Sequence, residues 1–311
     1  MISDMDSTGS GYASITTALG SRLADMGHEV KIIGLSYRGE EHNYKFSLLS
    51  CPDINDAFAM LNNMAVMFKP DVVIGLSDIP NQKPLVENAM KLKLPYICIT
   101  PMENGPLCAT WAMILAQANK CYVMSDFAVK ECDKMGVPAE HLVIGIDSEA
   151  WRPPTTEERK KIRESLGLEN EFVILTVADN QERKNLWGAF SAIEIFKQYT
   201  KKKFRYLLVT RENQYVGYRL RDMAQQHNIS QELMIFERGL PFKNLWGLFA
   251  AADVFLLTSK AEGAGMPVLE AMSVGVPVIA NATGAMPDHL KHGRGVLVPP
   301  EYTFIDTWGN S

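Results

Sequence analysis

Residues 259–281 constrain the fold more than any other part of the chain. The glycine-broken loop SKAEGAG is followed by a short helical pattern at 266–273 and then by an apolar run at 276–280. Another apolar run, at 253–258, precedes the loop. The order of strand, loop, helix and strand predicts a right-handed crossover in a parallel sheet. Such a unit is typical of an α/β protein.

Two acids in this stretch, Glu262 on the loop and Glu270 on the helix, lie eight positions apart. The loop leaves the carboxyl end of its expected strand. Open α/β sheets bind ligands at the carboxyl ends of their strands. The acids are therefore candidates for a binding site.

The same alternation extends along the whole chain. It is interrupted only at 144–159, which has no period and contains Pro153-Pro154. The pattern predicts two doubly wound domains, 1–150 and 151–311. In the first domain we expect strands at 1–4, 29–35, 71–76, 96–100 and 121–124, and helices at 11–26, 55–68, 83–93, 105–118 and 127–135. In the second we expect strands at 172–178, 204–209, 233–236, 253–258, 276–280 and 296–298, and helices at 186–199, 216–227, 243–252 and 266–273.

Both ends of the pattern are short. Only four residues remain for the first strand, and no helix is predicted after the last strand. We therefore expect truncation at both ends, with the last helix of the second domain missing.

Composition and charge narrow the class of protein. Residues 1–150 carry a net charge of −7 and residues 151–311 a net charge of +2. The acidic first half argues against nucleic acid as a partner. No apolar run approaches the roughly 20 residues of a membrane span, so no transmembrane segment is expected, whereas peripheral membrane contact stays open. Five cysteines without CxxC spacing fit a reduced, cytoplasmic compartment. The histidines and cysteines show no spacing typical of a metal site.

The order of several motifs resembles the retaining glycosyltransferases of family 4, which have the GT-B fold. EGAGMPVLEAMSVGVPVIAN is similar to their E-x7-E signature. GSGYASITTALGSRLADMGHEV is similar to their N-terminal glycine loop, and VADNQERKNLWGAFSAI to their phosphate-contacting turn. The resemblance covers nearly the whole chain. It implies two Rossmann-like domains that face each other across a cleft, with the acceptor on the first domain and the nucleotide sugar on the second.

The resemblance assigns roles in the second domain. Glu270 would accept hydrogen bonds from the ribose hydroxyls, because a carboxylate with two oxygens suits a vicinal diol. Glu262 would face the transferred sugar. Arg183 and Lys184 would oppose the negative charge that grows on the leaving diphosphate. The backbone N–H groups of the glycine loop would hold the sugar and the diphosphate, and they belong to Gly263, Ala264, Gly265 and Met266.

The first domain offers fewer candidates. Gly9 and Gly11 flank Ser10 at a predicted helix N-terminus, where free N–H groups attract anions. Glu103 and Asn104 occupy the region where many family members have a histidine that contacts the donor sugar. They are candidates for a sugar or acceptor contact, against the alternative of plain loop residues.

The chain differs from the family at the phosphate-contacting turn. The family usually has Gly-Arg where Ala178-Asp179 stands here. An acid near a diphosphate is unfavourable unless it points away from it. Which residue makes the second basic contact with the diphosphate is therefore not decided by the sequence, and Arg183 is one candidate.

The expected activity is transfer of a hexose from a nucleoside-diphosphate sugar to a hydroxyl of an unknown acceptor. We expect retention of configuration, with no metal and no cofactor. Two alternatives stay open. The altered turn, the missing histidine and the short ends favour a non-catalytic nucleotide-sugar binder. An NAD-dependent dehydrogenase is disfavoured, because GSGYAS has Ser14 where the dinucleotide fingerprint needs Gly or Ala. The pattern Asp4-Met5-Asp6 resembles a metal motif of the other glycosyltransferase fold and is discounted. The lysine run at 201–203 is expected to be a solvated turn.

Overall fold

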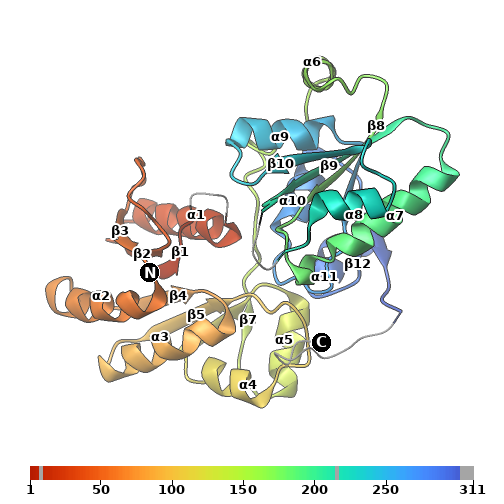
Figure 1. Ribbon diagram of the computed structural model, residues 1–311. Helices are drawn as coiled ribbons and strands as arrows, with labels where there is room; N and C mark the ends of the chain where they lie inside the picture. The colour runs from red at the N-terminus through yellow and green to blue at the C-terminus, as the bar shows by residue number, and fades with distance from the viewer. Residues whose placement is uncertain (7–9, 214–216, 302–311) are drawn as a thin grey trace. The chain divides into compact units, whose positions relative to one another are not determined.

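The computed structural model describes residues 1–6, 10–213 and 217–301. The chain divides into two compact units between Ile144 and Gly145, inside the stretch without a period. Each unit is built on a sheet whose described strands are all parallel (Figure 1). The predicted α/β class is confirmed.

The sheet of the first unit has seven strands in the order β3-β2-β1-β4-β5-β6-β7. The strands are β1 (Ile2–Asp4), β2 (Lys31–Leu35), β3 (Ser47–Cys51), β4 (Val73–Leu76), β5 (Tyr96–Thr100), β6 (Lys120–Val123) and β7 (Glu140–His141). The helices are α1 (Gly11–Asp25), α2 (Ile54–Met67), α3 (Ile79–Lys91), α4 (Ala109–Leu115) and α5 (Asp126–Lys134). The strand order reverses between β1 and β4.

Local sequence explains where these helices begin. The Ser10 hydroxyl accepts a hydrogen bond from the N–H of Tyr12, as expected for an N-cap. Asp53 caps α2 and Ser125 caps α5 in the same way. The helix expected at 105–118 is wrong at its beginning, because α4 begins only at Ala109. Pro106 disfavours helical backbone in the residue before it, so residues 101–108 form a loop.

The second unit has six strands in the order β10-β9-β8-β11-β12-β13. The strands are β8 (Phe172–Val177), β9 (Phe204–Thr210), β10 (Leu233–Glu237), β11 (Val254–Leu257), β12 (Val278–Asn281) and β13 (Val296–Val298). The helices are α6 (Thr156–Leu166), α7 (Leu186–Tyr199), α8 (Leu220–Gln226), α9 (Phe242–Ala251), α10 (Met266–Val274) and α11 (Met286–Leu290), with 3-10 turns η1 (Glu182–Lys184) and η2 (Lys291–Gly293).

The crossover predicted from residues 253–281 is confirmed. Strands β11 and β12 are parallel neighbours, with Phe255 opposite Val278, and α10 connects them. The strand order of this sheet reverses between β8 and β11. In open α/β sheets, ligands bind beside such a reversal, at the carboxyl ends of the strands. The unit is held by two apolar clusters that include Phe249 and Phe255 in one and Phe190 and Tyr206 in the other.

Among the described residues, two strands, two α-helices and the two 3-10 turns were not predicted from the sequence. Strands β3 and β7 lie at the two edges of the first sheet and have few buried residues. Helix α6 is highly charged and has no fully buried residue, so it has little apolar period. Its beginning nevertheless carries a capping box between Thr155 and Glu158. Helix α11 has only five residues, too few for a period to show.

Candidate donor site in the second unit

The candidate site lies at the strand reversal of the second unit. Two loops converge there. The phosphate turn, residues 178–185, follows β8, and the signature loop, residues 259–265, follows β11. Hydrogen bonds join the two loops. The N–H of Lys260 donates to the carbonyl of Arg183 at 2.8 Å, and the Thr258 hydroxyl donates to the carbonyl of Asn185 at 2.9 Å.

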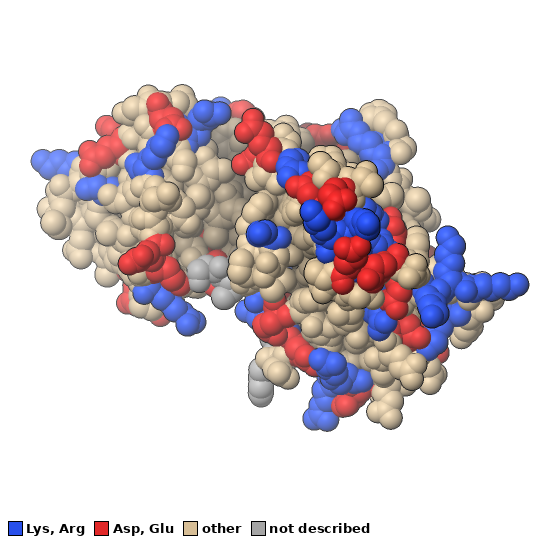
Figure 2. Space-filling model, turned by 90° about the horizontal axis from the view of Figure 1, so that it is seen from above, with Lys and Arg blue, Asp and Glu red and all other residues tan. Residues whose placement is uncertain are grey.

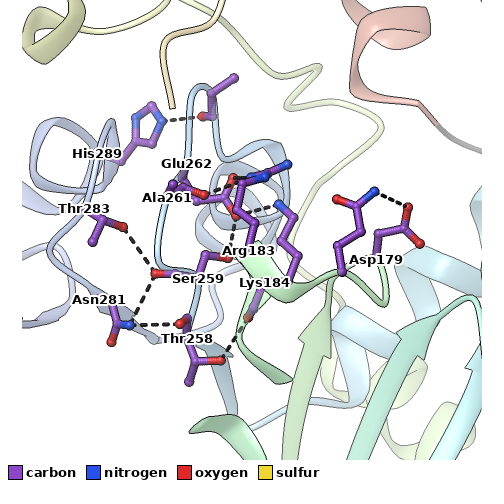
Figure 3. Close-up of polar contacts among 12 residues, drawn as sticks. Asp179, Arg183, Lys184, Thr258, Ser259, Ala261, Glu262, Asn281, Thr283 and His289 are labelled. Atoms are coloured by element: carbon purple, nitrogen blue, oxygen red, sulfur yellow. Dashed lines mark hydrogen bonds and ion pairs between the residues drawn. The ribbon is translucent and has the colours of Figure 1, made fainter. Parts of the chain in front are cut away.

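Glu262 is at the centre of this junction (Figure 3). Glu262 is only 4% exposed, although its side chain ends in a carboxylate. The Lys184 ammonium lies 2.6 Å from one carboxylate oxygen, and the Ser259 hydroxyl donates to the same oxygen at 2.6 Å. An Arg183 nitrogen lies 3.7 Å from the other oxygen. The structure therefore brings together all three residues predicted to be catalytic.

The surroundings of Glu262 keep it ionised. Burial raises the pKa of its carboxyl, but Lys184, Arg183 and Ser259 outweigh burial and hold the pKa below its usual value. A buried charge is tolerated only when it is paired and hydrogen-bonded. Two cations face one anion here, so the junction has a net positive charge.

Gly265 shapes the end of the signature loop. It has a positive φ of 63° and is the N-cap of α10. A Cβ at this position would lie 2.1 Å from the methyl carbon of Met286. Both constraints favour glycine. The loop thus presents the backbone of Gly263, Ala264 and Met266 at a helix N-terminus, where N–H groups and the helix dipole favour anions.

Helix α11 and the residues before it support the signature loop, and the sequence reading did not include them. A His289 ring nitrogen lies 2.7 Å from the carbonyl oxygen of Ala264, and the N–H of Ala285 donates to the carbonyl of Glu262 at 2.9 Å. The Asn281 amide and the Thr283 hydroxyl donate to the carbonyl of Ser259, at 3.3 Å each. The polar run NATGAMPDH after a predicted strand was the available signal.

Glu270 lies on α10 and has a different environment. It is half-buried, and no hydrogen bond or ion pair holds its carboxyl within the described part of the chain. Burial alone raises its pKa from 4.5 to about 7. A carboxyl of this kind is available for a ligand hydroxyl.

Asp179 occupies the position where the family usually has arginine. Its carboxylate accepts hydrogen bonds from Arg211 Nε at 2.9 Å and from Arg238 at 2.9 Å, and a second Arg211 nitrogen also bonds to it. Burial raises the pKa of the Asp179 carboxyl, and the two arginines outweigh it and hold the pKa below its usual value. Arg183 donates to the carbonyl of Ala261 at 2.9 Å, which places it on the signature-loop side of the turn.

Of the four candidates in the first unit, the structure describes Gly11, Glu103 and Asn104. Gly11 is the first residue of α1. Gly9 falls outside the described residues. Glu103 and Asn104 lie half-exposed in the loop between β5 and α4.

The predicted solvated turn at 201–203 lies at the amino end of β9, at the opposite edge of the second sheet from the signature loop. Its three lysines are exposed beside a hollow of about 410 Å³. On the face shown in Figure 2, Lys and Arg are interspersed with Asp and Glu. Among the described residues, no helix is both long and apolar enough to cross a bilayer.

Residues 158–304 match the family model "Glycosyl transferases group 1". The chain is 29% identical over 167 residues to a GDP-mannose-dependent monoacylated alpha-(1-6)-phosphatidylinositol monomannoside mannosyltransferase of Corynebacterium glutamicum, which covers 51% of this chain and 42% of the relative. It is 27% identical over 188 residues to O-antigen chain mannosyltransferase B of Escherichia coli, covering 56% and 46%. The chain thus spans less than half the length of these curated relatives.

Solved structures agree with the fold. Sucrose-phosphate synthase of Thermosynechococcus elongatus superimposes with a TM-score of 0.78 at 17% identity, covering 97% of this chain and 85% of the other. Anabaena Alr3699/HepE in complex with UDP-glucose superimposes with a TM-score of 0.73 at 17% sequence identity, and the match covers 92% of this chain and 80% of the other. The chain therefore has the GT-B fold, as predicted. Within the second unit, residues 158–304 are similar to the glycosyl transferases group 1 family, and the mannosyltransferase relatives are consistent with family 4.

Proposed function

We propose that the protein is a retaining glycosyltransferase that moves a hexose from a nucleoside-diphosphate sugar to an acceptor hydroxyl. The observation that carries this proposal is the buried junction of Lys184, Arg183 and Glu262 at the strand reversal. A diphosphate-sugar needs fixed cations, and this junction supplies them. The names of the matched relatives make GDP-mannose the first donor to test.

The residues divide the work by their chemistry. In the reaction, the bond between the sugar C1 and the leaving phosphate oxygen breaks, and a bond from C1 to the acceptor oxygen forms on the same face. The acceptor proton passes to the leaving phosphate. Lys184 and Arg183 stabilise the charge that develops on the diphosphate, and such preorganised contacts are worth about 2–4 kcal/mol each.

The remaining contacts hold the donor. The loop backbone from Gly263 to Met266 binds the sugar hydroxyls and the diphosphate, and Glu262 faces the transferred sugar. Glu270 accepts hydrogen bonds from the ribose hydroxyls. In the first unit, Gly9 and Gly11 approach the donor, while Glu103 and Asn104 contact the sugar or the acceptor. The mechanism needs no metal and no cofactor, and the proposed location is the cytoplasm.

The test is release of the nucleoside diphosphate from GDP-mannose and UDP-glucose. Lys184→Ala and Glu262→Ala are expected to reduce release about 100-fold or more, since each removes a contact of the reacting groups. Lys197→Ala is the control, because Lys197 pairs with Glu232 on an exposed surface. Melting curves establish that each variant is folded.

The outcomes separate the hypotheses. Release near the wild-type rate in both folded variants would refute the assignment of the site. Calorimetric binding of a nucleoside diphosphate by the wild type, without release from any donor of a broad panel, would instead favour the non-catalytic binder.

A further inference from the structure

Asp179 ties together the ends of three neighbouring strands. It follows β8, whereas Arg211 follows β9 and Arg238 follows β10. Because these strands are parallel neighbours, all three residues lie at the carboxyl edge of the sheet. This is the edge at which the signature loop also lies. The arginine pair, Arg211 and Arg238, thus occupies the flank of the site opposite the signature loop.

The phosphate turn connects the two charged groups. Asp179 lies near its beginning, just after β8, and Lys184 lies near its end, in η1; both are labelled in Figure 3. Lys184 and Arg183 face the β11 side through Glu262 and Ala261. Asp179 faces the β9 side through the arginine pair. One short turn is therefore flanked by cations on both sides.

The carboxylate of Asp179 is occupied by protein donors. Besides the arginines, it accepts the N–H of Asn180 at 3.1 Å and the Gln181 amide at 3.5 Å. A carboxylate offers about four acceptor sites, so Asp179 has little capacity left for a ligand. It bonds to both guanidinium groups, and the formal charges of these three side chains sum to +1.

This arrangement meets the requirements of an anion site. The side chains are only partly exposed, at 10% for Asp179, 22% for Arg238 and 39% for Arg211. Partial burial strengthens a charge-assisted hydrogen bond, and guanidinium groups suit phosphate oxygens in particular. Arginines already fixed by a carboxylate also lose less side-chain entropy when an anion binds.

We propose that Arg211 and Arg238, positioned by Asp179, form a second cationic arm that binds the diphosphate of the donor opposite Lys184. This inference rests on the proposed function and explains the acid at position 179. The positive charge is supplied by two neighbouring strands, and the acid positions it. Asp179 is a positioning residue and does not itself contact the donor.

The competing explanation is a purely structural clamp across three strand ends. Both explanations predict some loss of stability on mutation, so stability alone does not separate them. Selectivity for phosphate does, because a structural clamp has no preference for a ligand that carries phosphate.

The experiment measures binding of GDP and UDP by calorimetry, and of guanosine and uridine by ligand-observed NMR. Arg211→Met and Arg238→Met are compared with the wild type. At least one variant is expected to bind the preferred diphosphate tenfold or more weakly, with less than a twofold change for the matching nucleoside. Arg211→Lys, which keeps the charge, is expected to stay within about threefold of the wild type.

Arg205→Met is the matched control. Arg205 makes a two-bond pair with Glu171, at 2.8 Å for each bond, at the opposite edge of the same sheet. Its loss is expected to lower the melting temperature and leave diphosphate affinity unchanged.

The outcomes distinguish this inference from the proposed function. If the wild type binds neither GDP nor UDP and releases none from their sugars, the proposed function fails. If the wild type binds a diphosphate and both arginine variants retain its affinity, the inference alone fails. It also fails if nucleoside affinity falls in parallel with diphosphate affinity. If a methionine variant does not fold, Arg211→Lys and the other methionine variant decide.

Discussion

The two acids of the signature stretch lie eight positions apart and have opposite environments. Glu262, on the loop, is buried against Lys184, Arg183 and Ser259, and these partners hold its pKa below the usual value. Glu270, on the helix, has no such partners among the described residues, and burial raises its pKa to about 7. The same residue type thus has its pKa lowered at one position and raised at the other.

The difference shows how the fold assigns roles to similar residues. Glu262 lies where two loops converge, so cations from the phosphate turn reach it. Glu270 lies one turn into α10, where burial raises the pKa of its carboxyl. We infer that Glu262 organises the cations of the site, whereas Glu270 is kept for a ligand.

The largest effect on stability is expected when Glu262 loses its nearest cation, so that its environment becomes more like that of Glu270. Lys184→Met leaves the buried carboxylate with the Ser259 hydroxyl and with the more distant Arg183, at 3.7 Å. Removing one partner of a buried ion pair typically costs about 3–5 kcal/mol, and we expect a loss of about 3 kcal/mol in the free energy of unfolding at neutral pH. Urea denaturation measures it.

A double variant tests the cause of that loss. In Lys184→Met/Glu262→Gln neither buried group is charged, so part of the stability is expected to return. If the double variant is as unstable as the sum of the single variants, the two side chains are not coupled and the comparison between the acids fails.

The second prediction concerns Glu270 and pH. The unfolded chain releases this proton near pH 4.5 and the folded chain near pH 7. Between these values the folded state binds more protons, so stability falls as pH rises through this window. Glu270→Gln removes that loss. We expect it to be more stable than the wild type at pH 8, by up to about 2–3 kcal/mol, and to bind nucleoside diphosphate more weakly.

Glu262→Gln is the control, because the contribution of Glu262 to stability changes with pH in the opposite direction. The folded-state pKa of Glu262 is lowered, so its ion pairs contribute stability above the unfolded-state pKa and lose it as pH falls. Denaturation at pH 4, 6 and 8 follows both variants. Equal pH dependence in the wild type and in Glu270→Gln would contradict the raised pKa.

The smallest expected effect concerns Gly265, which lies between the signature loop and helix α10 and is compared with Gly275 at the other end of the helix. Gly265 and Gly275 both have positive φ, 63° and 83°, at the two ends of α10. Alanine at Gly265 meets Met286, whereas at Gly275 the nearest atom is a Pro153 carbon at 4.0 Å. We expect Gly265→Ala to cost about 1–2 kcal/mol more than Gly275→Ala, because a buried methionine must move.

Thermal unfolding of the two alanine variants provides the measurement. Backbone strain is common to both, so the difference isolates the contact with Met286. Equal losses would show that the signature loop relaxes without displacing α11.

Much of the fold could be predicted from the chain, because long elements carry their own periodicity. Helix α7 has the predicted bounds, and β13 ends the sheet as expected. Edge strands such as β3, and helices without a buried face such as α6, could not be predicted, because periodicity reports burial on one face. Proline placement limited α4, where the apolar pattern had suggested a longer helix.

In the candidate site, too, some residues could be predicted from the sequence and others could not. The motif order indicated Glu262, Lys184 and Glu270, and the structure brings Glu262 and Lys184 within 2.6 Å of each other. The support from His289 was not predictable, since it lies 25 residues from its partner Ala264 in a helix too short for a pattern. The arginine pair was not predicted either, because ion pairs between strand ends leave no spacing in the sequence.

The sequence by itself determined the order of strands and helices, the glycine-broken loops, and the residue types available at each strand end. Capping, turn chemistry and apolar periodicity are local properties, and they can be read from neighbouring residues. Only the tertiary structure decided which charges meet. It buried Glu262 between two cations, left Glu270 desolvated and without a polar partner among the residues that the structure describes, and turned the acid at position 179 toward two arginines. These outcomes depend on which strands become neighbours and on how far water is excluded, and both are properties of the folded sheet.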